Sequence, residues 1–204
     1  SYDLMEKMLK VYVYEEGEKP IFHQPYLTGI YASEAWFMKQ MEGSQHFVVD
    51  NPTKAHLFYM PFSSTSLRFE LYDARLHNGR KMVDYLKNYV GLISEKHPFW
   101  NRTSGADHFL AGCHDMATRP TARAMGNSIR ALCNADVSDG FRLGMDVSLP
   151  ETVVYKEQDP TRDLGGRPAR KRPVLAFFAG QMHGYLRPLL LQHWENRDPD
   201  MKVF

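Results

Sequence analysis

Short apolar runs alternate with helix-like segments along this chain of 204 residues, and that alternation limits the folds open to it. The run LKVYVYE at residues 9–15 places Leu9, Val11 and Val13 at alternate positions, which is typical of a half-buried strand. In residues 33–43 and 78–96, apolar side chains instead recur three and four positions apart, as on one face of a helix. Strands and helices that alternate in this way predict an α/β fold, with a mostly parallel sheet and helices on both faces.

The same reasoning assigns the remaining segments. We expect further strands at 46–50, 56–60, 107–113, 132–137, 174–180 and 201–204, a helical turn at 51–55, and helices at 122–132 and 187–194. In sheets of this kind, ligands bind outside the carboxyl ends of the strands. Polar residues that directly follow a predicted strand are therefore the first candidates for a functional site.

Composition and charge exclude several classes of protein. With 43% hydrophobic and 24% charged residues, the chain has the balance of a folded globular protein, and we expect a single domain over residues 1–204. The formal net charge of +1 gives no field that would favour nucleic acid, so no nucleic-acid partner is expected. No apolar run is long enough to span a bilayer. Because the chain starts at Ser1 and stops in the apolar stretch MKVF, we expect it to be part of a longer protein, which leaves room for a membrane anchor upstream.

The two cysteines, Cys113 and Cys133, leave two alternatives open. They could form one disulfide, or they could pack as two buried thiols, because both lie in apolar surroundings. Two cysteines cannot by themselves supply the four ligands of a structural zinc site.

Residues 107–115 concentrate polar side chains around a predicted strand. Asp107 and His108 lie where this strand begins, and His114 and Asp115 directly follow it. A histidine beside a carboxylate is a frequent general base, so in one interpretation these four residues line an acceptor pocket. In the other, His108 is a hydrogen-bonded core histidine and Asp115 is a helix cap. Neither the spacing of the histidines nor that of the cysteines matches a zinc motif, so no metal ligand is predicted.

The segment LAFFAGQMHG, residues 175–184, is a predicted buried strand that leads into a glycine-containing loop. Gly180 and Gly184 would let the backbone approach an anion or sugar hydroxyls closely. The alternative is a structural turn in which His183 caps the following helix. The loop contains neither GxxxxGK[ST] nor GxGxxG, so it is not a phosphate loop of those types.

Three further features have both a binding and a structural interpretation. The carboxylates of Asp146 and Glu151 could bind sugar hydroxyls or lie on a solvated turn. The basic run RPARKRP at 167–173 could bind an anion, but it has no interleaved aromatic residues and is better explained as a solvated linker. Asn101 begins an N-x-[ST] sequon, so it is a glycosylation site if the chain passes through the secretory pathway.

A series of ordered motifs resembles the plant branch of the exostosin family, the family 47 glycosyltransferases. The motifs span Leu9 to Phe204 and read LKVYVYEEGEKPIFHQP, GIYASEAWFM, KAHLFYMPFS, PFWNRTSGADHFL, CHD, LCNADVS, DVSLPE, LAFFAGQMHGYLRPLLLQHW and DMKVF.

The resemblance implies an architecture and a reaction. It implies the GT-B fold, in which two Rossmann-like halves face a cleft, with this chain as the amino-terminal, acceptor-side half. The half that binds the nucleotide sugar would begin shortly after residue 204, so the fragment alone is expected to be inactive. The whole protein would be a single-pass type II protein of the Golgi membrane with this domain in the lumen. It would transfer sugar with inversion from a nucleotide-sugar donor to a cell-wall polysaccharide or glycan, without a metal or other cofactor, and other glycosyltransferases could be complex partners.

The resemblance also selects site residues. Asp107, His108, His114, Asp115 and His183 lie inside matched motifs and are the pocket candidates. The first candidate for the base that deprotonates the acceptor hydroxyl is His114 beside Asp115, and His183 is the second. Gly180 and Gly184 are placed with Asp107 and His108 on the acceptor side.

A second function remains open from the sequence. The chain could be a non-catalytic polysaccharide-binding or complex-assembly module in which Trp36, Tyr72 and Trp100 stack on sugar rings. A hydrolase that uses Cys113 or a serine with His114 is disfavoured because the G-x-S-x-G motif is absent.

Overall fold

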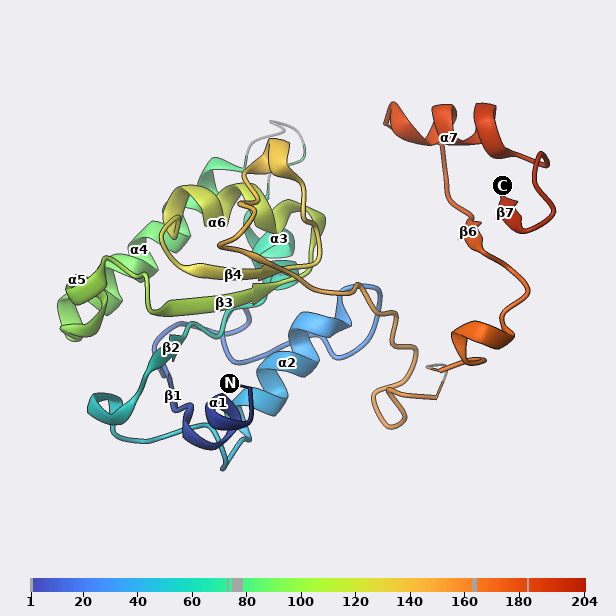
Figure 1. The fold of residues 1–204 in the computed structure, drawn as a ribbon. Coiled ribbons are helices and arrows are strands. Elements are labelled where there is room, and N and C mark those ends of the chain that lie inside the picture. The colour runs from blue at the N-terminus through green and yellow to red at the C-terminus, as the bar shows by residue number, and fades with distance from the viewer. Residues whose placement is uncertain (1, 73, 75–78, 163–164, 183) are drawn as a thin grey trace. The chain divides into compact units, whose positions relative to one another are not determined.

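The computed structural model describes residues 2–72, 74, 79–162, 165–182 and 184–204. It divides the chain into two compact units, residues 1–160 and 161–204 (Figure 1). Each unit is therefore described by itself. The single domain over residues 1–204 that was expected from the sequence stays a prediction.

A five-stranded sheet forms the centre of the first unit. Its strands lie in sequence order and every neighbouring pair is parallel. The strands are β1 (Val11–Val13), β2 (Leu57–Tyr59), β3 (His108–Gly112), β4 (Ile129–Leu132) and β5 (Val147–Ser148). All carboxyl ends therefore point to the same edge of the sheet, as predicted.

Helices cover both faces of this sheet (Figure 1). On one face lies α2, and on the other lie α3, α4 and α6. The helices of the unit are α1 (Tyr2–Met8), α2 (Ala32–Glu42), α3 (Ser64–Leu71), α4 (Arg80–Lys96), α5 (Phe99–Thr103) and α6 (Thr118–Ala124), with short 3₁₀ turns at Pro52–Lys54, Asp115–Ala117 and Val137–Asp139. The predicted α/β class, with a Rossmann-like parallel sheet, is confirmed.

The alternation in the first strand explains the two-sided core. Val11 and Tyr59 face α2 and pack with Met38 in one buried cluster. Tyr14 and Phe58 point to the opposite face, where they join a larger cluster. The helix α4 contributes five residues at helical spacing to that face, namely Met82, Val83, Leu86, Tyr89 and Ile93. Burial of such side chains contributes about 1.5–3 kcal/mol each, so α4 fixes one side of the sheet.

Three predicted elements are wrong. The predicted strand at 132–137 is absent, because β4 ends at Leu132 and a 3₁₀ turn begins at Val137. Residues 46–50 are not a strand, because only Val48 makes an isolated bridge, to Val11. Residues 122–132 are not one helix, because α6 ends at Ala124 and β4 begins at Ile129. The segment was predicted to be a helix, but Arg130 is completely buried in the strand. Its partner is 16 residues away, so no local pattern could show this.

The two cysteines form a disulfide. Cys113 directly follows β3 and Cys133 directly follows β4, and the two sulfurs are 2.06 Å apart. Of the alternatives left open by the sequence, the structure has the bridge. The bond ties the carboxyl ends of two neighbouring strands together.

The second unit contains one strand–helix–strand motif. A 3₁₀ turn at Ala169–Lys171 precedes the motif. The strands β6 (Ala176–Phe178) and β7 (Met201–Val203) pair in parallel, and α7 (Leu186–Trp194) connects them. All three main elements were predicted from the sequence. Several large apolar side chains of this unit are exposed, including Leu175, Phe177, Tyr185 and Leu186.

None of the helices among the described residues combines the length and the apolar character needed to cross a membrane.

Candidate functional site

The candidate site lies at the carboxyl end of β3, where the chain leaves the sheet. His114 follows the last residues of this strand, and Tyr31, directly before α2, packs its ring 4.6 Å from the imidazole between centroids. Phe69 of α3 lies 6.5 Å from the same imidazole and is itself largely exposed. One aromatic ring from the loop before α2 and one from α3 therefore lie beside the His114 imidazole.

The tautomer of His114 follows from its backbone contact. Its Nδ1 accepts a hydrogen bond from the backbone N–H of Met116 at 3.0 Å. A neutral imidazole has one N–H and one acceptor nitrogen, so the proton of neutral His114 is on Nε2. Burial lowers the pKa of His114, the Asp115 carboxylate partly opposes this, and Arg68 lowers the pKa further. At neutral pH His114 therefore presents a hydrogen-bond donor rather than a lone pair.

Asp115 supplies the acceptor of this site. Its side chain is exposed, and the Tyr31 phenol donates a hydrogen bond to it. Burial, followed by the charge of Asp115 and this hydrogen bond, raises the pKa of Tyr31 to about 12. Burial and the charge of Asp115 also raise the pKa of Glu151, which follows β5. Asp115 is thus an accessible carboxylate with a protonated phenol and an imidazole N–H nearby.

Neighbouring groups hold Asp115 at the rim of a hollow. The side-chain amide of Asn134, after β4, donates to the backbone oxygen of Asp115 at 2.9 Å. Asp115 also lines a hollow of about 370 Å³ together with Met116, Arg119 and Arg123. The helix cap in this segment is the side chain of His114, whereas Asp115 is the first residue of the 3₁₀ turn. Neither His114 nor Tyr31 is among the residues that line this hollow, so Asp115 lies between it and the two aromatic donors.

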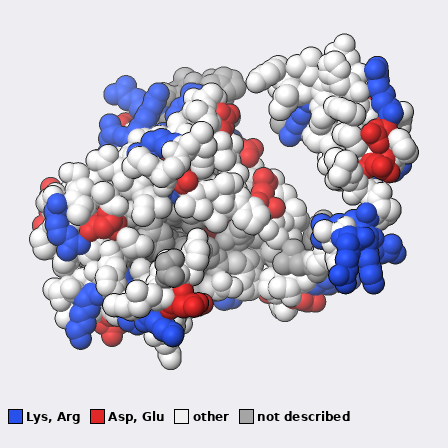
Figure 2. Space-filling view, viewed as in Figure 1, with Lys and Arg blue, Asp and Glu red and all other residues white. Residues whose placement is uncertain are grey.

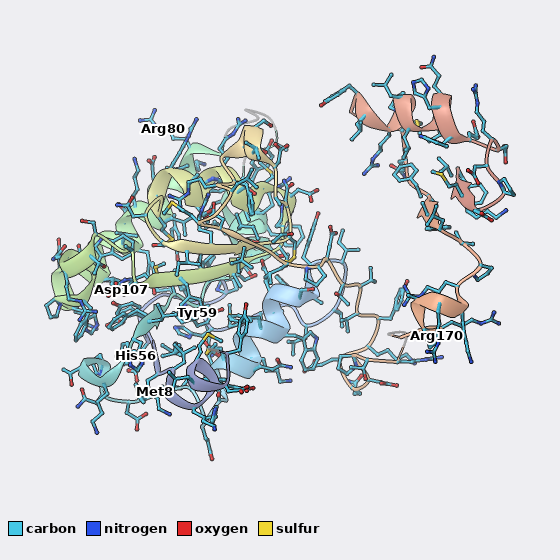
Figure 3. All side chains as sticks on the ribbon, in the orientation of Figure 1. Met8, His56, Tyr59, Arg80, Asp107 and Arg170 are labelled. Carbon is cyan, nitrogen blue, oxygen red and sulfur yellow. A yellow bond between two sulfur atoms is a disulfide. The ribbon has the colours of Figure 1, made fainter. Side chains whose placement is uncertain are left out.

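Asp107 and His108 lie at the opposite end of β3 from His114. The rise of about 3.3 Å per residue separates His108 from His114 by roughly 20 Å along the strand. Figure 3 shows Asp107 beside α5, at the amino end of the strand. The structure therefore does not bring the four polar residues of 107–115 into one pocket, although they are close in sequence.

His108 occupies the core. It is completely buried, with Nδ1 at 2.8 Å from Asp107 Oδ1 and Nε2 at 2.8 Å from the Tyr14 hydroxyl. Asp107 is held in turn by Arg102 at 2.5 Å and by the Thr103 hydroxyl at 2.6 Å. This placement corresponds to the core-histidine interpretation, and acceptor binding by His108 or Asp107 stays a prediction without a contact to support it.

The neutral, buried His108 predicts a pH dependence of stability. Burial lowers its pKa from 6.5 to about 4, although Asp107 raises it. Between these values the unfolded chain binds a proton that the folded chain does not, so the contribution of His108 is complete above pH 6.5 and is lost as the pH falls towards 4. The expected slope reaches at most about 1.4 kcal/mol per pH unit. Urea unfolding at a series of pH values should show this slope, and His108→Gln should flatten it. An unchanged slope in the variant would contradict the assignment.

The glycine-loop candidates lie in the second unit. Gly180 follows β6, and Gly184 precedes α7 with a positive φ of 71°, which a glycine adopts without strain. The backbone oxygen of Gln181 accepts a hydrogen bond from Arg187 at 2.6 Å, which holds the loop against α7. His183 lies outside the described residues. The roles assigned to these three positions stay predictions.

Asp146 has neither of the roles considered for it. Its carboxylate is buried between Arg130 and Arg142, so it is not on a solvated turn and cannot contact a sugar. Glu151, by contrast, is exposed near Asp115. The basic run at 167–173 is exposed throughout, and Figure 2 shows Lys and Arg side chains gathered over it, as the linker interpretation expects.

The remaining candidates have local partners. Asn101 is exposed on α5, and its amide nitrogen donates to the backbone oxygen of Ser94 at 3.0 Å. The three aromatic residues considered for sugar stacking are all half-buried. Lys39 lies over Trp36, Arg68 lies over Tyr72, and Trp100 packs against His108.

Among the residues that the structure describes, no group of three or more His, Cys, Asp or Glu side chains is arranged to hold a metal ion.

Comparison with protein families decides the identity of this fold. The exostosin GT47 domain matches residues 5–204, almost the whole chain. The chain belongs to the exostosin GT47 family. The parallel sheet with helices on both faces is consistent with one half of a GT-B glycosyltransferase of this family.

Relatives within the GT47 family come from plants. Two proteins of Arabidopsis thaliana named "Probable glycosyltransferase" are 43% and 42% identical to the chain over its full length. The chain spans 40% and 44% of their lengths. A third, named "Probable beta-1,4-xylosyltransferase IRX10" and also from Arabidopsis thaliana, is 37% identical over 52% of this chain and 26% of its own length.

Sequence reasoning missed several side chains that build the candidate site. Tyr31 was quoted only as a letter of a family motif, Glu34 was placed at the start of a predicted helix without a role in the site, and Ser64 and Arg68 were not assigned to any element. The only sequence signal for any of these residues was that Tyr31 and Glu34 lie near the start of a predicted helix. Nothing in the sequence around Tyr31 indicates that it contacts His114. His114 and Asp115, the two candidates for the general base, were found because they directly follow a predicted strand.

Proposed function

We propose that the full-length protein is a glycosyltransferase that moves a sugar from a nucleotide-sugar donor to a cell-wall polysaccharide or glycan, with inversion at the anomeric carbon. Membership of the GT47 family and the names of its relatives support this reaction class. In this proposal the first unit supplies the acceptor side. The observation that carries it is the exposed Asp115 carboxylate at the carboxyl end of β3, flanked by the Tyr31 phenol and the His114 imidazole.

The roles of the two neighbouring residues follow from their protonation. Asp115 takes the proton of the acceptor hydroxyl while that oxygen attacks the anomeric carbon. The new C–O bond forms opposite the bond to the nucleoside diphosphate, which leaves with the bonding electrons. His114, with its proton on Nε2, donates a hydrogen bond to the acceptor sugar and helps to orient it. For His114 to be the base, its Nδ1 would first have to release the Met116 amide.

The second unit belongs to the donor side in this proposal. Residues 161–204 form their own strand–helix–strand motif with a separate two-stranded sheet, which is how a second Rossmann-like half begins. The donor half would then start near Pro160 rather than after residue 204. Gly180 and Gly184 would accordingly belong to the donor half rather than to the acceptor half.

The disulfide supports a compartment of the secretory pathway, because such bonds persist in oxidising environments. We propose the Golgi lumen, with a type II membrane anchor upstream of this chain. Other glycosyltransferases remain proposed complex partners, and no metal or other cofactor is assigned to the reaction.

An assay of the full-length protein tests this function. Nucleotide sugars, including those of xylose, glucuronic acid and galactose, are incubated with a panel of wall oligosaccharides, and release of nucleoside diphosphate is measured with and without acceptor. Acceptor-dependent release that survives EDTA, with a product whose anomeric configuration is opposite to the donor's, is expected. Oligosaccharide binding without turnover for any donor would instead support the non-catalytic module.

A further inference from the structure

A buried carboxylate lies directly behind the candidate site. Glu34 of α2 is only 2% exposed. Its two oxygens accept hydrogen bonds from four groups on other segments, namely Ser63 Oγ at 2.8 Å, Ser64 Oγ, the Thr65 N–H at 3.0 Å and the Cys113 N–H at 2.6 Å. A buried carboxylate is costly unless its oxygens are satisfied, and here both are.

Glu34 is connected to two successive amides at the end of β3. The first connection is direct, from the Cys113 N–H. The second passes through Ser64, whose hydroxyl donates to Glu34 and accepts from the His114 N–H at 3.0 Å. The backbone that leads into His114 and Asp115 is therefore fixed against both α2 and α3.

Capping of α3 accounts for only part of this arrangement, namely the bond from the Thr65 N–H to Glu34. The side chain of Ser63 already caps α3 by accepting from the Ser66 N–H at 3.1 Å. The hydrogen bond that the His114 N–H donates to Ser64 Oγ satisfies no backbone group of α3. It joins the start of that helix to the end of a strand, at the point where the candidate site begins.

We propose that Glu34 and Ser64 are positioning residues for the transfer reaction. Both are buried, so neither touches the acceptor, and they act by holding the backbone at Cys113 and His114. This backbone determines where the His114 ring and the Asp115 carboxylate face the acceptor. The inference rests on the proposed function and adds the two residues that set its geometry.

A pair of serine variants of the full-length protein tests the proposal. Ser64→Ala removes the hydroxyl that links Glu34 to the His114 amide. Ser66→Ala is the matched control, because Ser66 lies on the same helix, is equally buried, and its hydroxyl has no hydrogen-bond partner in the described part of the chain. We expect Ser64→Ala to lower kcat about ten- to a hundredfold, with little change in the KM for the acceptor. Ser66→Ala should retain kcat, and Glu34→Gln should resemble Ser64→Ala.

Hydrogen exchange measured by mass spectrometry supplies a readout that needs no substrate. The amides of residues 113 and 114 should exchange faster in Ser64→Ala and Glu34→Gln than in the wild type or Ser66→Ala. If the wild type transfers no sugar, the proposed function fails whatever the exchange rates are. If the wild type is active but Ser64→Ala equals Ser66→Ala in kcat or in exchange at 113–114, the positioning role alone is wrong.

Discussion

Replacing Asp115 with asparagine should lower kcat of the full-length protein by about 10² to 10⁴, the usual contribution of a general base. Asparagine has nearly the same shape and can still accept the hydrogen bond of the Tyr31 phenol, but it cannot take the proton of the acceptor hydroxyl. Binding of the acceptor should change little. The measurement is initial-rate kinetics with the donor and acceptor identified by the panel assay.

Two control variants make this result specific. Asp139→Asn changes another aspartate that lines the same hollow but pairs with Arg119, and it should retain kcat. Glu151→Gln changes the neighbouring carboxylate, whose raised pKa also makes it a reasonable base. If Glu151→Gln abolishes transfer while Asp115→Asn retains it, the base is Glu151 and our assignment is wrong.

Replacing Asp146 with asparagine should lower the free energy of unfolding by about 3–5 kcal/mol, because it leaves Arg130 buried without a counter-charge. The side chains of Arg130 and Asp146 are both completely buried and paired. Asp146 also accepts from the Arg142 backbone N–H at 2.7 Å, while Arg130 donates to the backbone oxygen of Gly140 at 2.6 Å. The pair thus connects β4 to the loop that precedes β5, and urea unfolding measures its loss.

The response of this ion pair to pH has a definite sign. Burial by itself raises the pKa of Asp146, but hydrogen bonds from Arg130 and Arg142 outweigh it, so the pKa is lowered. The stabilisation is complete above the unfolded value of about 3.9 and is lost as the pH falls through the folded value.

Asp139→Asn is again the matched control, because its partner Arg119 is 62% exposed and a surface pair contributes at most about 1 kcal/mol. The double variant Arg130→Met/Asp146→Leu removes both buried charges and should recover much of the loss, even where Asp146→Asn does not fold. A cost below about 1 kcal/mol for Asp146→Asn would contradict the argument.

The parts of the fold that could be predicted from sequence are those determined by local periodicity. The helix α4 was found because its buried residues recur at helical spacing, and β1 because Val11 and Val13 alternate with Tyr12 and Tyr14. The helix α3 was missed because its first turn is Ser64, Thr65 and Ser66, polar residues whose burial depends on the distant Glu34. Likewise β4 was misread because Arg130 is neutralised from another segment.

For the candidate site, only the residues that directly follow a predicted strand could be identified from the sequence. His114 and Asp115 were found because they follow a strand, and strand ends are where parallel sheets bind ligands. Asp107 and His108 were grouped with them because they are near in sequence, but a strand is extended and carries its two ends apart. Tyr31 and Ser64 come from other segments, so their contacts depend on tertiary packing that one sequence does not reveal.

The bond between Cys113 and Cys133 affects how the protein can be prepared. Each sulfur belongs to the residue directly before a side chain discussed above, His114 in one case and Asn134 in the other. Bacterial cytoplasm keeps thiols reduced, so a recombinant sample made there would carry two separate thiols next to the catalytic candidates. Expression in a periplasmic or eukaryotic secretory host would produce the cross-linked molecule to which the kinetic expectations apply.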